Sequence, residues 1–162
     1  MCKVPSDALS MLNLLKERHV VLLRARHTKN PGQFKEINNR AGNTTFVDWQ
    51  LVSGTLKKGY EWYSLLRHPF AKAAYMMFLV SEVHPFLDGN GRTSRLVMEY
   101  VVRSLGLPTV IISDFNDDVV TTESDWADDI GRGMLRTIQA LERCEKDLNQ
   151  AGCNVLPPAP LK

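Results

Sequence analysis

One short segment of the chain, His84 to Arg95, brings together an imidazole, a carboxylate, two glycines and two arginines. Gly89 and Gly91 let the backbone approach a ligand closely, and free amides at the start of a helix attract phosphate. Arg92 and Arg95 would share one helix face, so both could reach polyphosphate oxygens above the first turn. The segment therefore predicts a cradle for a phosphorylated ligand.

Two further side chains could supply chemistry beside this cradle. Asp88 offers a hard carboxylate oxygen, and magnesium is commonly held by one or two carboxylates together with substrate phosphates and water. His84 titrates near neutral pH and could accept the proton of an attacking hydroxyl group. Asp88 is thus the predicted metal ligand, and His84 is the predicted general base.

Each of these residues also has a simpler interpretation. A single histidine at a helix end usually caps carbonyls or is exposed, which is the reading we give to His19, His27 and His68. A pair of glycines alone indicates a turn, and a pair of arginines alone indicates a solvated helix face. Their combination in one segment is what favours a site over these alternatives.

The chain around the segment is predominantly helical. Apolar residues at helical spacing predict a first helix from the possible N-cap Ser6 to near His27, and a second from about Trp49 to Leu66. Gly54 and Gly59 make it doubtful that the second helix is uninterrupted. Its aromatic residues are expected to pack in a core rather than to form a recognition surface; they are Trp49, Tyr60, Trp62 and Tyr63.

The candidate site falls between two further helices. Pro69 suits the first turn of a buried helix that continues to Val83, and Pro85 ends that helix at His84. A loop then leads to a helix over about 92–105, which ends at Gly106. The turn-rich residues 38–43 predict a short hairpin between Gly32 and Asp48, which could serve as a mobile flap.

The remaining sequence is less informative. We expect a β-branched stretch over 109–112, an acidic turn over 113–118 and a long helix over about 124–150. Asp114, Asn116 and Asp118 imitate the start of a calcium loop, but the glycine and the final glutamate of such a loop are missing. We expect a single domain over 1–156 and a Pro-rich, disordered tail over 157–162.

The segment from His84 to Arg95 resembles the Fic family, whose motif HPFx[DE]GN[GK]RxxR it matches at every specified position. The resemblance extends to the stretches PGQFK (31–35) and AGNTTFV (41–47), and it covers roughly 9–106. It implies a mostly α fold, a Fic-type helical core with a short β-hairpin flap near the active site. It also implies that Phe86 points into the core.

The resemblance further implies a protein adenylyltransferase that needs ATP and Mg²⁺. His84 would deprotonate a Ser, Thr or Tyr hydroxyl of a target protein, which would attack the α-phosphate of ATP and release pyrophosphate. Asp88 would hold magnesium, and the flap residues would align the target by strand addition. The phosphate-binding residues would be Gly89, Asn90, Gly91, Arg92 and Arg95, and the flap residues would be Thr44, Thr45 and Phe46.

Rival interpretations remain open at the level of sequence. Asp88 and Gly91 match the AMP-transferring pattern, but the same site could transfer UMP or GMP, remove AMP, or hold nucleotide as an inactive scaffold. A helical nucleic-acid-binding domain is a further alternative; its cations would be Arg24, Arg26, Lys29, Lys35 and Arg40. The formal net charge of only +2 gives no broad footprint for nucleic acid.

Partners and compartment are predicted from simpler features. Many relatives carry an inhibitory [ST]xxxE[GN] helix, which this sequence lacks, so a separate antitoxin-like inhibitor or constitutive activity is expected. Cys2, Cys144 and Cys153 show no Cys-x-x-Cys spacing, and no apolar run has the length of a membrane span. We therefore expect a cytoplasmic protein with no membrane partner; an effector delivered into host cells is the alternative.

Overall fold

The computed structural model describes residues 4–107, 109, 139 and 143, and the chain divides into two compact units, 1–105 and 106–162. All the helices and strands reported below lie in the first unit. The stretches predicted over 109–112, 113–118, 124–150 and 157–162 lie outside the described residues, apart from single positions. The prediction of one domain over 1–156 accordingly stays a prediction.

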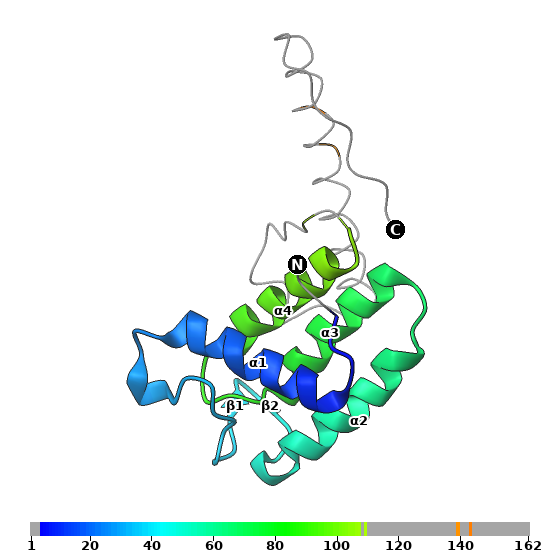
Figure 1. The fold of residues 1–162 in the computed structure, drawn as a ribbon. Coiled ribbons are helices and arrows are strands. Elements are labelled where there is room, and N and C mark those ends of the chain that lie inside the picture. Colours follow the sequence, from blue (N-terminus) through cyan, green and yellow to red (C-terminus); the bar gives the residue numbers. More distant parts are fainter. Residues whose placement is uncertain (1–3, 108, 110–138, 140–142, 144–162) are drawn as a thin grey trace. The chain divides into compact units, whose positions relative to one another are not determined.

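The first unit is built from four α-helices, which confirms the predicted mostly α fold (Figure 1). Helix α3 packs against α2 on one side and α4 on the other, and α1 contacts both α2 and α4. The helices are α1 (Ala8–Leu23), α2 (Val52–Leu65), α3 (Pro69–Val83) and α4 (Asn90–Ser104). Two short 3₁₀ helices, η1 (His27–Lys29) and η2 (Trp49–Leu51), precede the hairpin and α2 respectively.

Helix α1 starts one residue later than predicted, because Asp7 rather than Ser6 is its N-cap. The Asp7 carboxylate accepts the Ser10 amide at 2.7 Å, and the Ser10 hydroxyl accepts the Asp7 amide at 3.1 Å. This reciprocal pair satisfies two donors that a helix start leaves open. The helix also ends at Leu23, before the predicted end near His27, and the chain continues through a turn into η1.

Helix α2 is continuous despite its two glycines. Gly54 has open space around it, whereas Gly59 is buried against Leu79 of α3. A side chain at Gly59 would collide with Leu79, so this glycine allows α2 and α3 to approach closely. The low helix propensity of glycine therefore does not interrupt α2. At Gly59 the packing of α2 against α3 outweighs that propensity.

Helix α3 forms the centre of the unit, as its apolar sequence predicted. Its buried side chains belong to the core; they are Ala73, Ala74, Met76, Met77, Leu79, Val80 and Val83. Tyr63 from α2 is also buried, with 1% of its surface exposed. The expectation of core packing is wrong for Trp49 and Trp62, which are 40% and 58% exposed.

The predicted hairpin is present but very short. Strands β1 (Arg40–Ala41) and β2 (Thr44–Thr45) pair antiparallel, with Arg40 opposite Thr45 and Ala41 opposite Thr44. The turn is confined to Gly42 and Asn43, and Gly42 adopts a left-handed conformation with φ of 54°. Both strands are exposed, so their edges are accessible to another chain.

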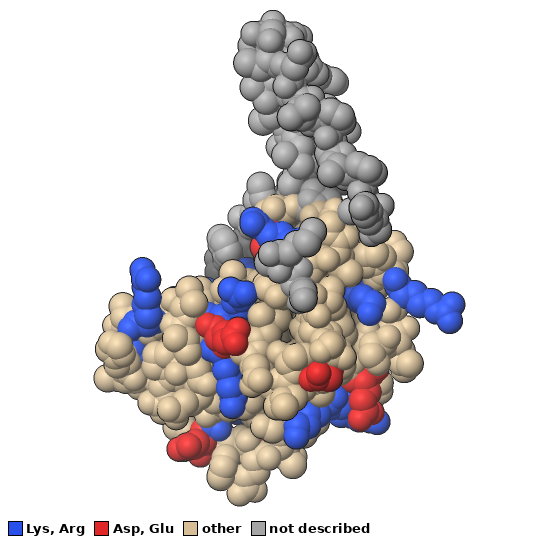
Figure 2. All heavy atoms as spheres, viewed as in Figure 1, with Lys and Arg blue, Asp and Glu red and all other residues tan. Residues whose placement is uncertain are grey.

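Charged side chains of the described residues are scattered over the face shown in Figure 2. Lysine, arginine, aspartate and glutamate side chains lie there among uncharged residues. This agrees with the formal net charge of +2. In the part of the chain described, no helix has the length and apolarity that crossing a membrane requires.

Candidate active site

The chemical groups of the motif lie where α3 ends and α4 begins. His84 closes α3 in a left-handed conformation with φ of 50°, and its amide donates to the carbonyl of Val80 at 3.1 Å. Pro85 follows and disfavours further helix at His84. Gly89, with φ of 76°, is the N-cap of α4. The two positive φ angles turn the chain sharply, so the whole motif loop lies beside one helix start.

His84 has a defined tautomer. Its Nδ1 lies 3.1 Å from the carbonyl oxygen of Ser81, which can only accept a hydrogen bond, so Nδ1 carries the proton. The lone pair is therefore on Nε2. Burial lowers the pKa of His84 below its ordinary value, and the nearby Lys35 ammonium lowers it further, although the bond to Ser81 opposes the shift. The imidazole is accordingly neutral near pH 7 and can accept a proton.

The start of α4 provides free amide donors. No side chain caps the helix at Gly89, and the first amides of any helix lack an intrahelical acceptor. Arg95 approaches this turn, because a Cβ on Gly91 would lie 4.0 Å from its Nη1. Arg92 projects outward, with 49% of its side chain exposed. The structure thus brings Gly89, Gly91 and both arginines together around an anion-attracting helix terminus.

Asn90 is engaged in shaping the loop. Its side chain is 3% exposed; its Oδ1 accepts the Phe86 amide and its Nδ2 donates to the Phe86 carbonyl, both at 2.8 Å. This pair of bonds closes the loop into a compact turn. Phe86 itself is fully buried, which confirms that it points into the core.

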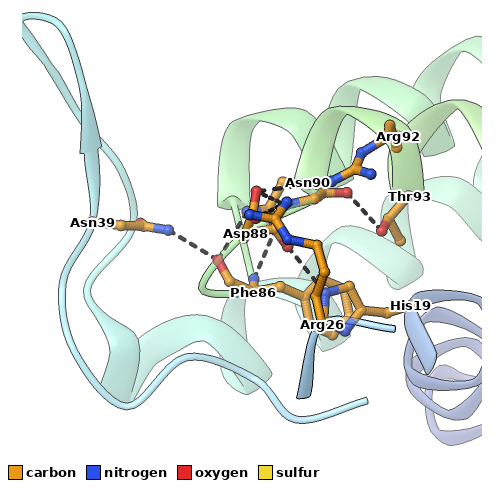
Figure 3. A network of polar contacts seen from close by, with 9 residues as sticks. His19, Arg26, Asn39, Phe86, Asp88, Asn90, Arg92 and Thr93 are labelled. Atoms are coloured by element: carbon orange, nitrogen blue, oxygen red, sulfur yellow. Dashed lines mark hydrogen bonds and ion pairs between the residues drawn. The ribbon is translucent and has the colours of Figure 1, made fainter. Parts of the chain in front are cut away.

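Asp88 lies at the mouth of the cradle with 30% of its side chain exposed. Its Oδ2 forms an ion pair with Nη1 of Arg26 at 2.8 Å, and its Oδ1 is 4.0 Å from Nη2 of Arg92 (Figure 3). Among the described residues there is no group of three histidine, cysteine or acidic side chains that could hold a metal. Asp88 could therefore bind magnesium only together with oxygens of a ligand or water.

The flap lies against the candidate base. The ring of Phe46 stacks on the imidazole of His84, with centroids 3.6 Å apart. The preceding residues Thr44 and Thr45 are exposed in β2. The structure therefore joins Phe46 directly to His84 and leaves the two threonines at the open edge of the hairpin.

Two flap residues that sequence reasoning did not select tie the hairpin to the motif loop. Lys35 is 4% exposed; its Nζ donates to Oδ1 of Asn39 at 2.6 Å, and its amide donates to the Pro85 carbonyl at 2.8 Å. Asn39 in turn donates from Nδ2 to the Phe86 carbonyl at 3.0 Å (Figure 3). The stretch PGQFK (31–35), which is part of the resemblance to the Fic family, was the available signal for Lys35.

His19 and Arg26 were also not predicted as part of the site. His19 comes from α1 and contacts the backbone of Asp88, while Arg26 follows α1 and pairs with the Asp88 carboxylate. Both lie more than sixty residues before Asp88. Spacing in the sequence contained no signal for such long-range contacts.

The site lies in a helical domain, between a helix that ends at a histidine and a glycine-capped helix that carries two arginines in its first turns. The sequence model of the Fic/DOC family matches residues 9–102, which include the whole site. The chain belongs to the Fic/DOC family.

Relatives of known name support this assignment. A Fido domain-containing protein of Dictyostelium discoideum is 33% identical over 95 residues, which are 55% of this chain and 66% of that protein. The protein adenylyltransferase Fic of Drosophila persimilis is 51% identical over 45 residues, which are 28% of this chain and 9% of that protein. The chain thus matches only a small part of the adenylyltransferase.

Solved structures agree with the fold. A Fic domain-containing signaling protein from Bacteroides thetaiotaomicron aligns with a TM-score of 0.59 and 21% identity, covering 82% of this chain and 58% of that one. A fragment of Fic-1 from C. elegans carrying E274G aligns with a TM-score of 0.61 and 21% identity, covering 93% and 46%. At these identities the likeness concerns the fold.

Proposed function

We propose that this chain is a protein adenylyltransferase, which transfers AMP from ATP to a Ser, Thr or Tyr hydroxyl of a target protein. The observation that carries the proposal is the neutral His84, which ends α3 shortly before the glycine-capped start of α4 and whose Nδ1 is bonded to Ser81, so that Nε2 keeps its lone pair. Relatives named protein adenylyltransferase Fic support the same activity.

His84 Nε2 accepts the proton of the target hydroxyl as its oxygen attacks the α-phosphorus of ATP. The bond between that phosphorus and the oxygen bridging to the β-phosphate breaks. Pyrophosphate leaves with the bonding electrons, and AMP remains esterified to the target. A base in reach of the attacking hydroxyl accelerates such a step.

The cradle residues bind and orient the triphosphate. The Gly91 amide donates to phosphate oxygens at the positive end of α4, and the Gly89 amide does so once a phosphate oxygen replaces Oδ1 of Asp88 as its acceptor. Arg92 and Arg95 neutralise the outer phosphates. Asn90 supports the cradle through its bonds to Phe86. Holding the leaving pyrophosphate in line with the target oxygen is the main contribution expected of such groups.

The site also suits Mg²⁺. Asp88 is a partly exposed carboxylate that already attracts the cationic Arg26, and one carboxylate with phosphate oxygens and water satisfies this ion. When bound there, magnesium would neutralise charge on the phosphates and help to orient them. Asp88 would be its protein ligand.

The target is a hydroxyl-bearing protein segment docked along the flap. Thr44 and Thr45 form an exposed strand whose edge could pair with an extended chain, so recognition would rest on backbone register. Phe46 stacks on His84, so a target segment paired with β2 would lie next to the base.

The cysteine spacing supports a cytoplasmic setting, because Cys2, Cys144 and Cys153 form no Cys-x-x-Cys pair. A separate antitoxin-like inhibitor would be the regulator.

The test is incubation of wild-type protein and His84→Ala in a cell lysate with Mg²⁺ and ATP labelled at the α-phosphate. Mass spectrometry of the labelled proteins reports both the transferred mass and the modified residue. The proposal expects AMP on hydroxyl side chains with wild-type protein only. Label that persists with His84→Ala overturns the assigned base.

Parallel incubations separate the rivals. Transfer from labelled UTP or GTP in preference to ATP would change the donor, and loss of AMP from a previously modified protein would indicate the reverse reaction. Tight binding of ATP with no transfer to any lysate protein would make the domain a nucleotide-binding scaffold.

A further inference from the structure

His19 is a histidine on α1 that is completely buried, with 0% of its surface exposed. Its ring lies flat on the ring of Phe86, with centroids 3.8 Å apart and planes inclined by 7°. Its Nδ1 is 2.9 Å from the amide nitrogen of Gly32. Its Nε2 is 3.0 Å from the carbonyl oxygen of Asp88 (Figure 3). Both ring nitrogens are therefore used.

These partners fix the direction of each hydrogen bond. A backbone amide can only donate, so Nδ1 of His19 accepts from Gly32. The ring proton is then on Nε2, which donates to the Asp88 carbonyl. One neutral imidazole thus links α1, the turn at Gly32 and the motif loop.

The bond to Asp88 sets the orientation of a whole peptide plane. The described residues contain no cis peptide bond, so the Asp88 carbonyl and the Gly89 amide point in opposite directions. With the carbonyl held inward by His19, the Gly89 amide points to the other side, where it donates to Oδ1 of Asp88 at 2.6 Å. That side carries the carboxylate assigned to magnesium, so a bound phosphate oxygen would replace Oδ1 of Asp88 as the acceptor of the Gly89 amide.

Gly89 makes such a restraint necessary. It has a φ of 76° and no side chain, so the plane before it can rotate at little steric cost. Helix α1 also supports this glycine directly, since a Cβ on Gly89 would lie 3.3 Å from Cδ1 of Leu23. The orientation of the first donor of the cradle therefore depends on α1.

We propose that His19 is a positioning residue for nucleotide binding, because it holds the Asp88–Gly89 peptide with the Gly89 amide facing the phosphates. This inference rests on the proposed function, since it assumes that the cradle binds a triphosphate. His19 lies in the interior beneath the loop and acts through the backbone of Asp88.

Three variants separate the two hydrogen bonds from packing. His19→Gln can place an amide nitrogen near the position of Nε2 and keep the donor to Asp88. His19→Asn can place an oxygen near the position of Nδ1 and keep the acceptor for Gly32, but it does not reach Asp88. His19→Phe keeps the stack on Phe86 and loses both bonds. Urea unfolding identifies the conditions in which each variant is folded.

The affinity of Mg²⁺·ATP for these proteins, measured by isothermal titration calorimetry, is the decisive quantity. His19→Gln should bind within about threefold of wild type, and His19→Asn and His19→Phe should bind roughly tenfold more weakly, as expected for loss of one oriented hydrogen bond. Equal binding by folded His19→Asn and His19→Gln would overturn the proposal. Should His19→Asn or His19→Phe not fold, the Gly89 amide resonance of wild type decides: it must shift when Mg²⁺·ATP is added.

The same titrations distinguish the failure of each proposal. Wild-type protein that binds Mg²⁺·ATP in the predicted order of variants, but transfers no AMP, would retain the role of His19 and refute the transferase. Transfer of AMP at unchanged ATP affinity in all three variants would retain the transferase and refute the role of His19. Absence of any ATP binding by the wild type would refute both.

Discussion

The ring of Phe46 lies flat against the imidazole of His84, with centroids 3.6 Å apart and planes inclined by 9°. The flap and the proposed base are therefore in direct contact. This contact removes water from one face of the imidazole, and burial is the main cause that lowers the pKa of His84. Flap position and base strength are consequently coupled in this fold.

The pH profile of AMP transfer should reflect the lowered pKa of His84. The base works in its neutral form, so the rate rises with pH through the pKa of His84 and becomes constant above it. Because that pKa lies below the ordinary value of 6.5, the midpoint of the rise should also fall below pH 6.5. Initial rates between pH 5 and 8 at saturating ATP measure it, and a midpoint above 6.5 contradicts the assignment.

Replacing Phe46 by Ala should shift this profile. Removal of the stacked ring admits water to His84, which relieves part of the desolvation and raises the pKa of the imidazole toward its ordinary value. The acidic limb of the profile should therefore move to higher pH. Thr45→Ala, also in the flap but exposed, is the matched control and should leave the limb in place. An unchanged limb in Phe46→Ala would show that the stack does not desolvate the base.

Arg26 forms an ion pair with the Asp88 carboxylate, which is the proposed magnesium ligand. Its Nη1 is 2.8 Å from Oδ2 of Asp88, so a metal ion must displace or share this cation. Arg26→Gln should lower the Mg²⁺ concentration required for half-maximal ATP binding by about threefold, in line with the modest strength of exposed ion pairs. Arg24→Gln makes the same charge change at an exposed neighbour and is the control. A higher Mg²⁺ requirement in Arg26→Gln would instead assign Arg26 to phosphate binding.

Lys35 should matter for the target rather than for ATP. Lys35→Met removes the buried ammonium and leaves Oδ1 of Asn39 without this donor, which loosens the hairpin above Phe86. We expect kcat/KM for a protein target to fall about tenfold, as for loss of a charged hydrogen bond, while ATP affinity stays within about twofold. Lys57→Met on the exposed surface of α2 is the control. Parallel losses in ATP affinity and target use would place the defect in the cradle instead.

The sequence predicted the local parts of this structure well and the long-range parts poorly. Pro69 and Pro85 act through their own backbone preferences, so they marked the two ends of α3. The next helix was predicted from about residue 92, whereas α4 begins at Asn90. His19 contacts Asp88 across 69 residues and Lys35 contacts Pro85 across 50 residues, and such contacts leave no periodic signal. The motif thus identified the groups proposed to face the ligand, but not His19 and Lys35, which hydrogen-bond to the backbone of the motif loop.

The two glycines of α2 illustrate the same distinction and give a stability test. A Cβ at Gly59 would lie 2.4 Å from Cδ1 of Leu79, whereas a Cβ at Gly54 would meet nothing within 4 Å. Gly54→Ala should stabilise the protein by up to about 1 kcal/mol, because alanine favours helix over glycine. Gly59→Ala gains the same preference but forces Leu79 away, and overpacking of this kind costs about 1–3 kcal/mol.

Urea unfolding of the two alanine variants should therefore show opposite shifts in the free energy of unfolding. Adding Leu79→Ala to Gly59→Ala tests the cause, since it removes the methyl groups that the new Cβ would meet. In the presence of Leu79→Ala, the Gly59→Ala change should cost less than it does alone, a non-additive result expected for residues in contact. If Gly59→Ala is as stabilising as Gly54→Ala, the close approach of α2 and α3 at this glycine is wrong.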